Sequence, residues 1–116
     1  MKRDMELIRL LLIQQEGETK PDLSGYTQEQ IIYHGALLIE AELVHGNVHE
    51  SMNGLDGVFL DRLTWQGHEF LDAARNEVLW KKVRDASLKI GGGLTLPLAK
   101  ALLAKYAKEL LGLDVT

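Results

Sequence analysis

Residues Thr27 to Val44 read TQEQIIYHGALLIEAELV and contain the signals of a helix followed by the start of a strand. Thr27 is a good helix N-cap, and Gln30 stands three residues later, where a capping box needs a glutamate or glutamine. The spacing of the apolar residues predicts a helix to about Glu42. Leu43 and Val44 are then expected to leave in an extended conformation. A helix that leads directly into a strand sets the expectations for the rest of the chain.

Two segments rich in β-formers follow this helix, VHGNVHE at 44–50 and GVFLDRL at 57–63, and they predict two strands. Asn53-Gly54 is a turn signal between them. The intervening tip, ESMNGLD, is too long for a two-residue hairpin loop, so we expect a floppy wing. The order helix, strand, tip, strand, helix is typical of a winged helix.

Helices are predicted on both sides of this unit. Asp4 is expected to cap a helix to about Glu16, and Gly17 to end it. After the hairpin, Thr64 is expected to cap a helix whose apolar residues are Trp65, Phe70, Leu71 and Ala74.

Two further helices are predicted at the C-terminal end, with a glycine hinge at residues 91–93 between them. Asn76 caps the first, and Thr95 with Pro97 opens the second, which runs to about Leu111. Their apolar stripes comprise Leu79, Trp80, Val83, Ala86 and Ile90 in the first and Ala99, Leu102, Leu103, Tyr106 and Leu110 in the second.

The fold class expected from these elements is α+β, mainly α. It consists of a winged-helix core (helices plus a small antiparallel β-hairpin wing) with two additional C-terminal helices. The core covers residues 1–74, and the C-terminal helical extension covers residues 75–116. We expect the extension to be packed on the core or used for dimerisation, within a single domain overall.

Composition limits the classes of protein to which the chain can belong. Its 116 residues fit one domain, and the absence of cysteine excludes a disulfide framework and a thiolate metal site. No apolar run approaches the roughly 20 residues of a membrane span. We also predict no signal peptide, because no small-residue cleavage site follows the charged start. A cytoplasmic protein with no membrane association is the expectation.

The charge is unevenly distributed along the chain. Residues 1–45 contain four basic and eight acidic residues, whereas residues 75–110 contain eight basic and three acidic ones. A basic patch is the electrostatic signature of nucleic-acid binding. Here the basic residues lie away from the helix that would enter a DNA groove.

The central helix is poorly suited to DNA. Helices that read bases use Arg or Lys for guanine and Asn or Gln for adenine, yet residues 27–43 contain no Lys or Arg. Its excess apolar residues, Ala36, Leu37 and Ile39, predict that the C-terminal helices or a second subunit cover it. The candidate interaction surface is Gln30, Tyr33, Leu37 and Glu40. If the chain instead binds duplex DNA, the candidate phosphate contacts are Arg75, Lys81, Lys82, Arg84 and Lys89.

Sites for metals, cofactors and catalysis are not expected. His45 and His49 share a strand face, but their local spacing supplies no third ligand. His34 is expected to pack beside Ile31 and Leu38 as a satisfied, partly buried side chain. The three glycines at 91–93 lack the preceding strand and the lysine of a P-loop, so they predict a hinge. We assign no catalytic residues, no cofactor and no metal.

Two motifs resemble those of winged-helix regulators. LLIEAELV is similar to the end of their recognition helix, L-x-x-L-x-x-x-G-L-V, and RLTWQGHEFL to the L-T-x-x-G-x-x-x-L that follows the wing. MKRDMELIR, YHGALLIEAELV and RLTWQGHEFLDAARNEVLWKKV together resemble a small bacterial and phage family, domain of unknown function 2513. The resemblance covers nearly the whole chain. It implies a winged helix with C-terminal helices and association with phage or mobile elements, and it implies no known activity.

Two positions depart from the winged-helix pattern. Glu42 stands where regulators place the glycine that ends the recognition helix in a left-handed turn, so we expect this helix end to be shaped differently. Gly35 replaces a core leucine. It leaves room for another element to approach, with a Trp or Phe as the expected neighbour, or it softens the helix.

The function expected from the sequence is a non-enzymatic regulatory or protein-interaction module, associated with phage or mobile elements. Its partner would be another protein or a second copy in a homodimer. A DNA-binding transcriptional regulator is the alternative, and a metal-dependent enzyme is a distant third.

Overall fold

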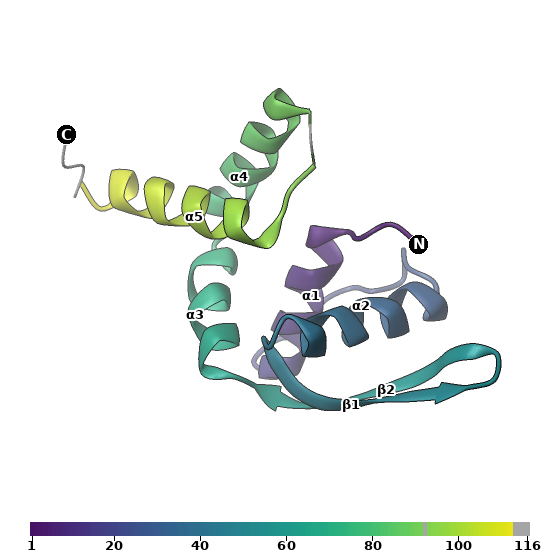
Figure 1. The fold of residues 1–116 in the computed structure, drawn as a ribbon. Helices are drawn as coiled ribbons and strands as arrows, with labels where there is room; N and C mark the ends of the chain where they lie inside the picture. The colour runs from purple at the N-terminus through teal and green to yellow at the C-terminus, as the bar shows by residue number, and fades with distance from the viewer. Residues whose placement is uncertain (92, 113–116) are drawn as a thin grey trace. The chain divides into compact units, whose positions relative to one another are not determined.

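The computed structural model describes residues 1–91 and 93–112. Within these ranges it contains five helices and a two-stranded antiparallel hairpin, which confirms the α+β, mainly helical fold class (Figure 1). The elements are α1 (Met5–Glu16), α2 (Gln28–Glu40), β1 (Val44–Ser51), β2 (Gly54–Leu63), α3 (Trp65–Ala74), α4 (Glu77–Ile90) and α5 (Leu96–Leu110). No helix in the described part of the chain is long and apolar enough to cross a membrane.

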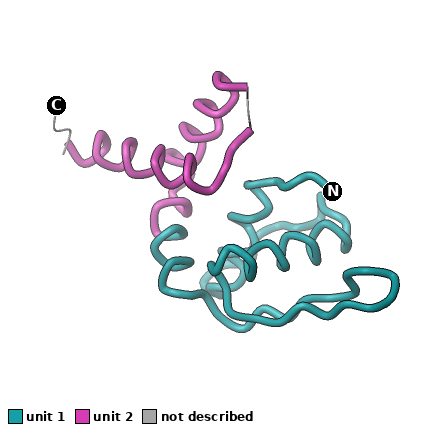
Figure 2. Tube along the Cα trace, viewed as in Figure 1, with its two compact units in different colours: residues 1–71 teal, residues 72–116 magenta. Residues whose placement is uncertain are grey.

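The chain forms two compact units, residues 1–71 and residues 72–116 (Figure 2). The boundary predicted from the sequence lies after Ala74, whereas the structural division falls after Leu71, inside α3. The first unit contains α1, α2, the hairpin and the start of α3. The second contains α4 and α5.

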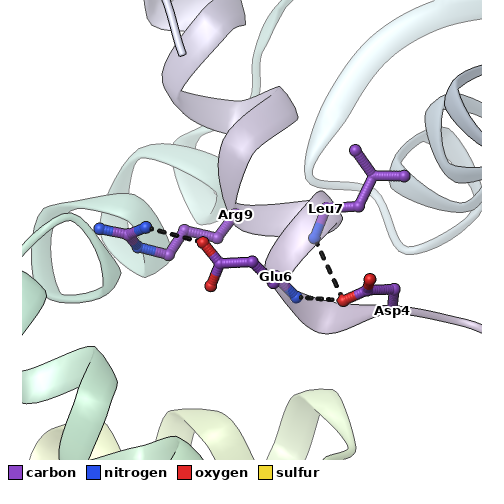
Figure 3. Close-up of polar contacts among 4 residues, drawn as sticks. All are labelled: Asp4, Glu6, Leu7 and Arg9. Atoms are coloured by element: carbon purple, nitrogen blue, oxygen red, sulfur yellow. Dashed lines mark hydrogen bonds and ion pairs between the residues drawn. The ribbon is translucent and has the colours of Figure 1, made fainter. Parts of the chain in front are cut away.

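The start of α1 is fixed by its own side chains (Figure 3). The Asp4 carboxylate accepts hydrogen bonds from the backbone N–H groups of Glu6, at 2.9 Å, and Leu7, at 3.4 Å. The Arg9 guanidinium donates to the Glu6 carboxylate at 3.2 Å. Gly17 ends the helix in the left-handed conformation, with a φ of 86°. Both predicted boundaries of α1 are confirmed.

The predicted capping box of α2 is present. Thr27 N–H donates to Gln30 Oε1 at 2.8 Å, and Gln30 N–H donates to Thr27 Oγ1 at 3.1 Å. The helix ends at Glu40, two residues earlier than expected, because the chain turns sharply at Glu42.

Glu42 keeps the left-handed geometry that regulators give to a glycine, so the prediction of a differently shaped helix end is wrong. Its φ is 61°, and among the described residues no other non-glycine residue has a positive φ. Glu42 N–H donates to Ile39 O, and Leu43 N–H donates to Leu38 O, both at 3.0 Å. These two bonds form a Schellman motif, and its usual apolar contact fits the buried side chains of Leu38 and Leu43.

The hairpin is longer and tighter than predicted. The strands continue into the expected tip, where Glu50 pairs with Leu55 and Ser51 with Gly54, so that two residues form the loop. The prediction of a long, floppy tip is therefore wrong. Irregularities at His45/Gly46 and His49/Glu50 insert an extra residue into β2 at each place. Gly54 follows the loop with a φ of 102°, which glycine adopts without strain.

The first unit is held together by the packing of α1 and α2 on the hairpin. Gly35 lets α2 approach β2, since a Cβ atom at that position would lie 2.7 Å from Val58 Cγ1. The neighbour is thus a valine, not the expected Trp or Phe. The Gln15 side-chain amide ties α1 to β2 by donating to the carbonyls of Leu60, at 3.1 Å, and Asp61, at 2.8 Å.

The second unit pairs α4 with α5. Asn76 caps α4 and Thr95 caps α5, as predicted, and Gly91 ends α4 in the left-handed conformation. Gly92, within the predicted hinge, lies outside the described residues. On α4 and α5 the described side chains that are buried are Leu79, Trp80, Val83, Ala99 and Leu103. Ile90 and Leu110, which were assigned to the apolar stripes, are instead exposed, because they lie in the last turns of their helices.

Candidate functional site

The first unit is strongly acidic. Residues 1–71 contain five Lys or Arg and twelve Asp or Glu, a formal charge of −7, and the remaining residues carry +3. Between residues 21 and 74, Arg62 is the single Lys or Arg, against nine Asp or Glu. Its guanidinium already bonds the Asp61 carboxylate at 3.0 Å. The helix–hairpin surface is therefore suited to a cationic ligand and unsuited to an anionic one.

The four residues predicted as an interaction surface form one stripe along α2, because they recur at positions i, i+3, i+7 and i+10. Gln30, Tyr33 and Leu37 are half-buried, and Glu40 is exposed. The Gln30 side chain is engaged in the capping box. Tyr33, Leu37 and Glu40 are the members of the stripe that remain accessible to a partner.

His34, beside this stripe, is a structural residue. Its side chain is satisfied, as expected, but fully buried instead of partly buried. Nε2 accepts from the Asp4 N–H and Nδ1 faces the Gln30 carbonyl, each at 2.8 Å. The Tyr33 ring meets it edge-on, with ring centroids 5.5 Å apart. Neither nitrogen is available to a substrate.

An open hollow of about 510 Å³ is lined by residues from the end of α2, the start of β1 and the start of α3. We call it the Glu42–Trp65 hollow. All its lining residues belong to the first unit: Ile39, Glu42, Val44, His45, Gly46, Thr64, Trp65 and Gln66. The lining thus combines the apolar residues Ile39 and Val44 with an acidic residue, Glu42, and an indole, Trp65.

Thr64 and Gly67 fix the shape of this hollow. The Thr64 hydroxyl donates to the Glu42 carbonyl at 2.6 Å and accepts from the Gly67 N–H at 2.9 Å, which caps α3 as predicted. A Cβ atom at Gly67 would lie 2.0 Å from the Leu43 carbonyl oxygen. The close approach of α3 to the end of α2 therefore depends on both residues.

Trp65, which was grouped with Phe70, Leu71 and Ala74 as an apolar residue of this helix, lies on the surface of α3, because 76% of it is exposed. Its indole N–H donates to the Glu69 carboxylate. At 100° per residue, Trp65 lies opposite the buried face of Gly67, Phe70 and Leu71. The helical phase was therefore a signal in the sequence that could have identified Trp65 as a surface residue.

The predicted phosphate contacts all lie in the second unit and are all exposed. Arg75 pairs with Asp72 at 3.6 Å, and the Lys82 ammonium lies 5.8 Å from the centre of the Tyr106 ring. The other four lie on α4 and are exposed, as are Glu77 and Asp85 on the same helix. These four are Lys81, Lys82, Arg84 and Lys89.

The histidines of the hairpin do not form a metal site with their neighbours. His49 Nδ1 lies 3.8 Å from an Asp56 carboxylate oxygen, and both side chains are largely exposed. Among the residues with a described position, no group of three His, Asp or Glu is arranged to hold a metal ion.

Fold and surface together define a small, mainly helical protein with an acidic helix–hairpin unit. The model of a family described as "Hypothetical protein (DUF2513)" matches residues 2–93. The chain therefore belongs to this family, which confirms the resemblance found in the sequence. It is also similar to an uncharacterised protein from Haemophilus influenzae, with 35% identity over 91 residues that cover 72% of this chain and 76% of that protein. No solved structure matches the chain.

Proposed function

We propose that this chain is a non-enzymatic protein-interaction module, in which a winged-helix scaffold presents α2 and the hairpin to a protein partner. The order of α2, hairpin and α3 supports the scaffold, as does the RLTWQGHEFL segment that follows the hairpin. The proposal includes a cytoplasmic location and the association with phage or mobile elements that the family resemblance implies.

The charge of the first unit carries this proposal. Phosphate contacts from Lys and Arg supply most of the sequence-independent affinity for DNA. A winged helix that bound DNA through α2 would bring a unit of charge −7 to the phosphates. Repulsion would then oppose binding, whereas a protein partner with a basic surface would be attracted.

The half-buried stripe on α2 provides the apolar part of the interaction. Tyr33 and Leu37 offer surface next to the exposed carboxylate of Glu40. Protein interfaces are enriched in tyrosine and place apolar groups inside a polar rim. Binding through this stripe accounts for apolar residues on α2 beyond those that face the hairpin.

The test is affinity capture with the full chain, followed by identification of the retained proteins, with light scattering to detect self-association. Leu37→Asp should abolish a partner or dimer that the wild type forms. Ile90→Asp, which makes the same change at an exposed site of the second unit, should retain it. A strictly monomeric wild-type chain that captures no protein would overturn the proposal, as would equal binding by both variants.

A DNA-binding regulator is the second candidate, because residues 75–110 carry eight basic and three acidic residues and the five candidate contacts are exposed. Fluorescence anisotropy with labelled duplex DNA at low and high salt distinguishes the two. The interaction module predicts no binding at low salt. Binding that weakens steeply with salt, and that is lost when Lys81 and Lys82 are both changed to Glu, would favour the regulator.

A further inference from the structure

The Glu42–Trp65 hollow has features that point to a particular ligand group. Trp65 lines the hollow with Ile39 and Val44 and is 76% exposed, and the bond from its indole N–H to the Glu69 carboxylate sets an acid at the edge of the ring. Glu42 is the acidic residue among those that line the hollow, whereas Glu69 is held beside it by the bond to Trp65. Cations, most often the guanidinium of arginine, bind over the face of a tryptophan ring, and carboxylates bind the same group through paired hydrogen bonds.

We infer that this hollow binds an arginine side chain presented by a basic segment of a protein partner. The inference rests on the proposed function and specifies its partner. Charge complementarity favours this occupant, since the unit around the hollow carries −7 and Arg62, its one Lys or Arg between residues 21 and 74, is paired with Asp61. The flat guanidinium can stack on the ring while it donates to a carboxylate.

The end of α2 also favours a cation. The C-terminus of a helix carries partial negative charge, which cations stabilise. The last turn of α2 contains no basic residue, and Glu40 and Glu42 lie at this end instead. An arginine in the hollow would offset this accumulation of negative charge. At the start of α3, the Gly67 N–H is already bonded to the Thr64 hydroxyl.

The identity of residue 42 supports a role in binding. A glycine would adopt the φ of 61° without strain, whereas a glutamate is strained in this left-handed conformation. Strained residues that persist in a structure are often found at ligand-binding sites. Glu42→Gly should therefore raise the melting temperature and weaken the binding of arginine. A purely structural role of Glu42 would not produce these two opposite effects.

The test is a titration of the full chain with a fluorescently labelled, acetylated tetra-arginine amide, followed by anisotropy at physiological salt. Tetra-lysine and the uncharged tetra-citrulline amide are the matched ligands. We expect arginine to bind more tightly than lysine, and citrulline not to bind. Glu42→Gln and Trp65→Leu should each weaken arginine binding about fivefold, the effect of a partly exposed cation contact of roughly 1 kcal/mol.

Glu50→Gln is the control variant, because it removes the same charge from an exposed hairpin position that does not line the hollow. In this variant the affinity for tetra-arginine should stay within about twofold of the wild-type affinity, as expected for a distant surface charge screened by salt. Equal weakening by the variants at 42 and 50 would overturn the inference, as would no arginine binding by the wild type. A partner captured through Leu37 without arginine binding would overturn this inference alone and leave the proposed function standing.

Discussion

The backbone N–H of Asp4 donates a hydrogen bond of 2.8 Å to Nε2 of His34, which joins the start of α1 to the middle of α2. The Gln30 carbonyl can only accept, so Nδ1, which lies 2.8 Å from it, carries the proton. His34 is therefore a neutral imidazole in one tautomer, and it serves as a buried bridge between the two helices.

Replacing this bridge should destabilise the first unit. In His34→Phe the N–H of Asp4, the N-cap of α1, would lose its hydrogen-bond partner. We therefore expect the free energy of unfolding to fall by about 1–3 kcal/mol. Urea denaturation followed by circular dichroism measures the change. His68→Phe makes the same replacement at an exposed helical position and should shift stability by no more than about 0.5 kcal/mol. Equal losses of stability in His34→Phe and His68→Phe would show that the His34 bridge does not contribute to the free energy of unfolding.

The close approach of Gly35 to Val58 predicts that Gly35→Ala lowers the free energy of unfolding in the wild type and raises it in a Val58→Ala background. Gly35→Ala places a Cβ atom against the branched Val58 side chain, and such overpacking costs about 1–3 kcal/mol. In a Val58→Ala background the space is open, and the alanine should stabilise α2 by up to about 1 kcal/mol through helix propensity. A double-mutant cycle in urea measures the coupling. Additive effects would rule out the steric contact.

Thr64 joins two helix ends through one hydroxyl, which donates to Glu42 O and accepts from Gly67 N–H. Thr64→Val keeps the shape and removes both bonds, so we expect a loss of about 1–2 kcal/mol, in the range of a lost N-cap. Thr64→Ser keeps the hydroxyl and should stay close to the wild type. Thermal denaturation of the three proteins decides between this account and one in which the methyl group of Thr64 provides the stability. In the second case Thr64→Ser would be less stable than Thr64→Val.

The helix ends could be predicted because their signals are local. Asp4, Thr27 and Asn76 each cap a helix through side-chain bonds to N–H groups within three residues, and a short sequence window contains both partners. The hairpin tip was mispredicted because its length depends on register. The bulges that let the strands extend to Ser51 and Gly54 arise only when both strands pair.

The candidate site shows the same limit. The stripe on α2 follows from helical spacing, and it was predicted from the sequence. The Glu42–Trp65 hollow requires a contact across 22 residues between the Glu42 carbonyl and the Thr64 hydroxyl, which no local pattern encodes. The helical phase of Trp65 could have predicted that its side chain is exposed, but the residue was grouped with the other apolar residues of its helix.

Tyr26 predicts how stability changes in alkaline solution. Partial burial raises the pKa of the Tyr26 phenol above its ordinary value of 10.0, and the charges of Asp4 and Glu6 and a hydrogen bond to Asp4 raise it further. The neutral phenol is thus favoured in the folded state. Its contribution to stability is complete below the unfolded pKa and is lost as the pH rises through the higher folded pKa.

The wild type should therefore lose stability above about pH 10 relative to Tyr26→Phe, which has no phenol to ionise. Melting temperatures of the two proteins across the alkaline range measure this difference. Asp4→Asn is the matched control, since asparagine retains the N-cap while the negative charge is removed. In that variant, absorbance titration of the phenolate should show a lower pKa for Tyr26. An unchanged titration would mean that the Asp4 carboxylate does not act on the phenol.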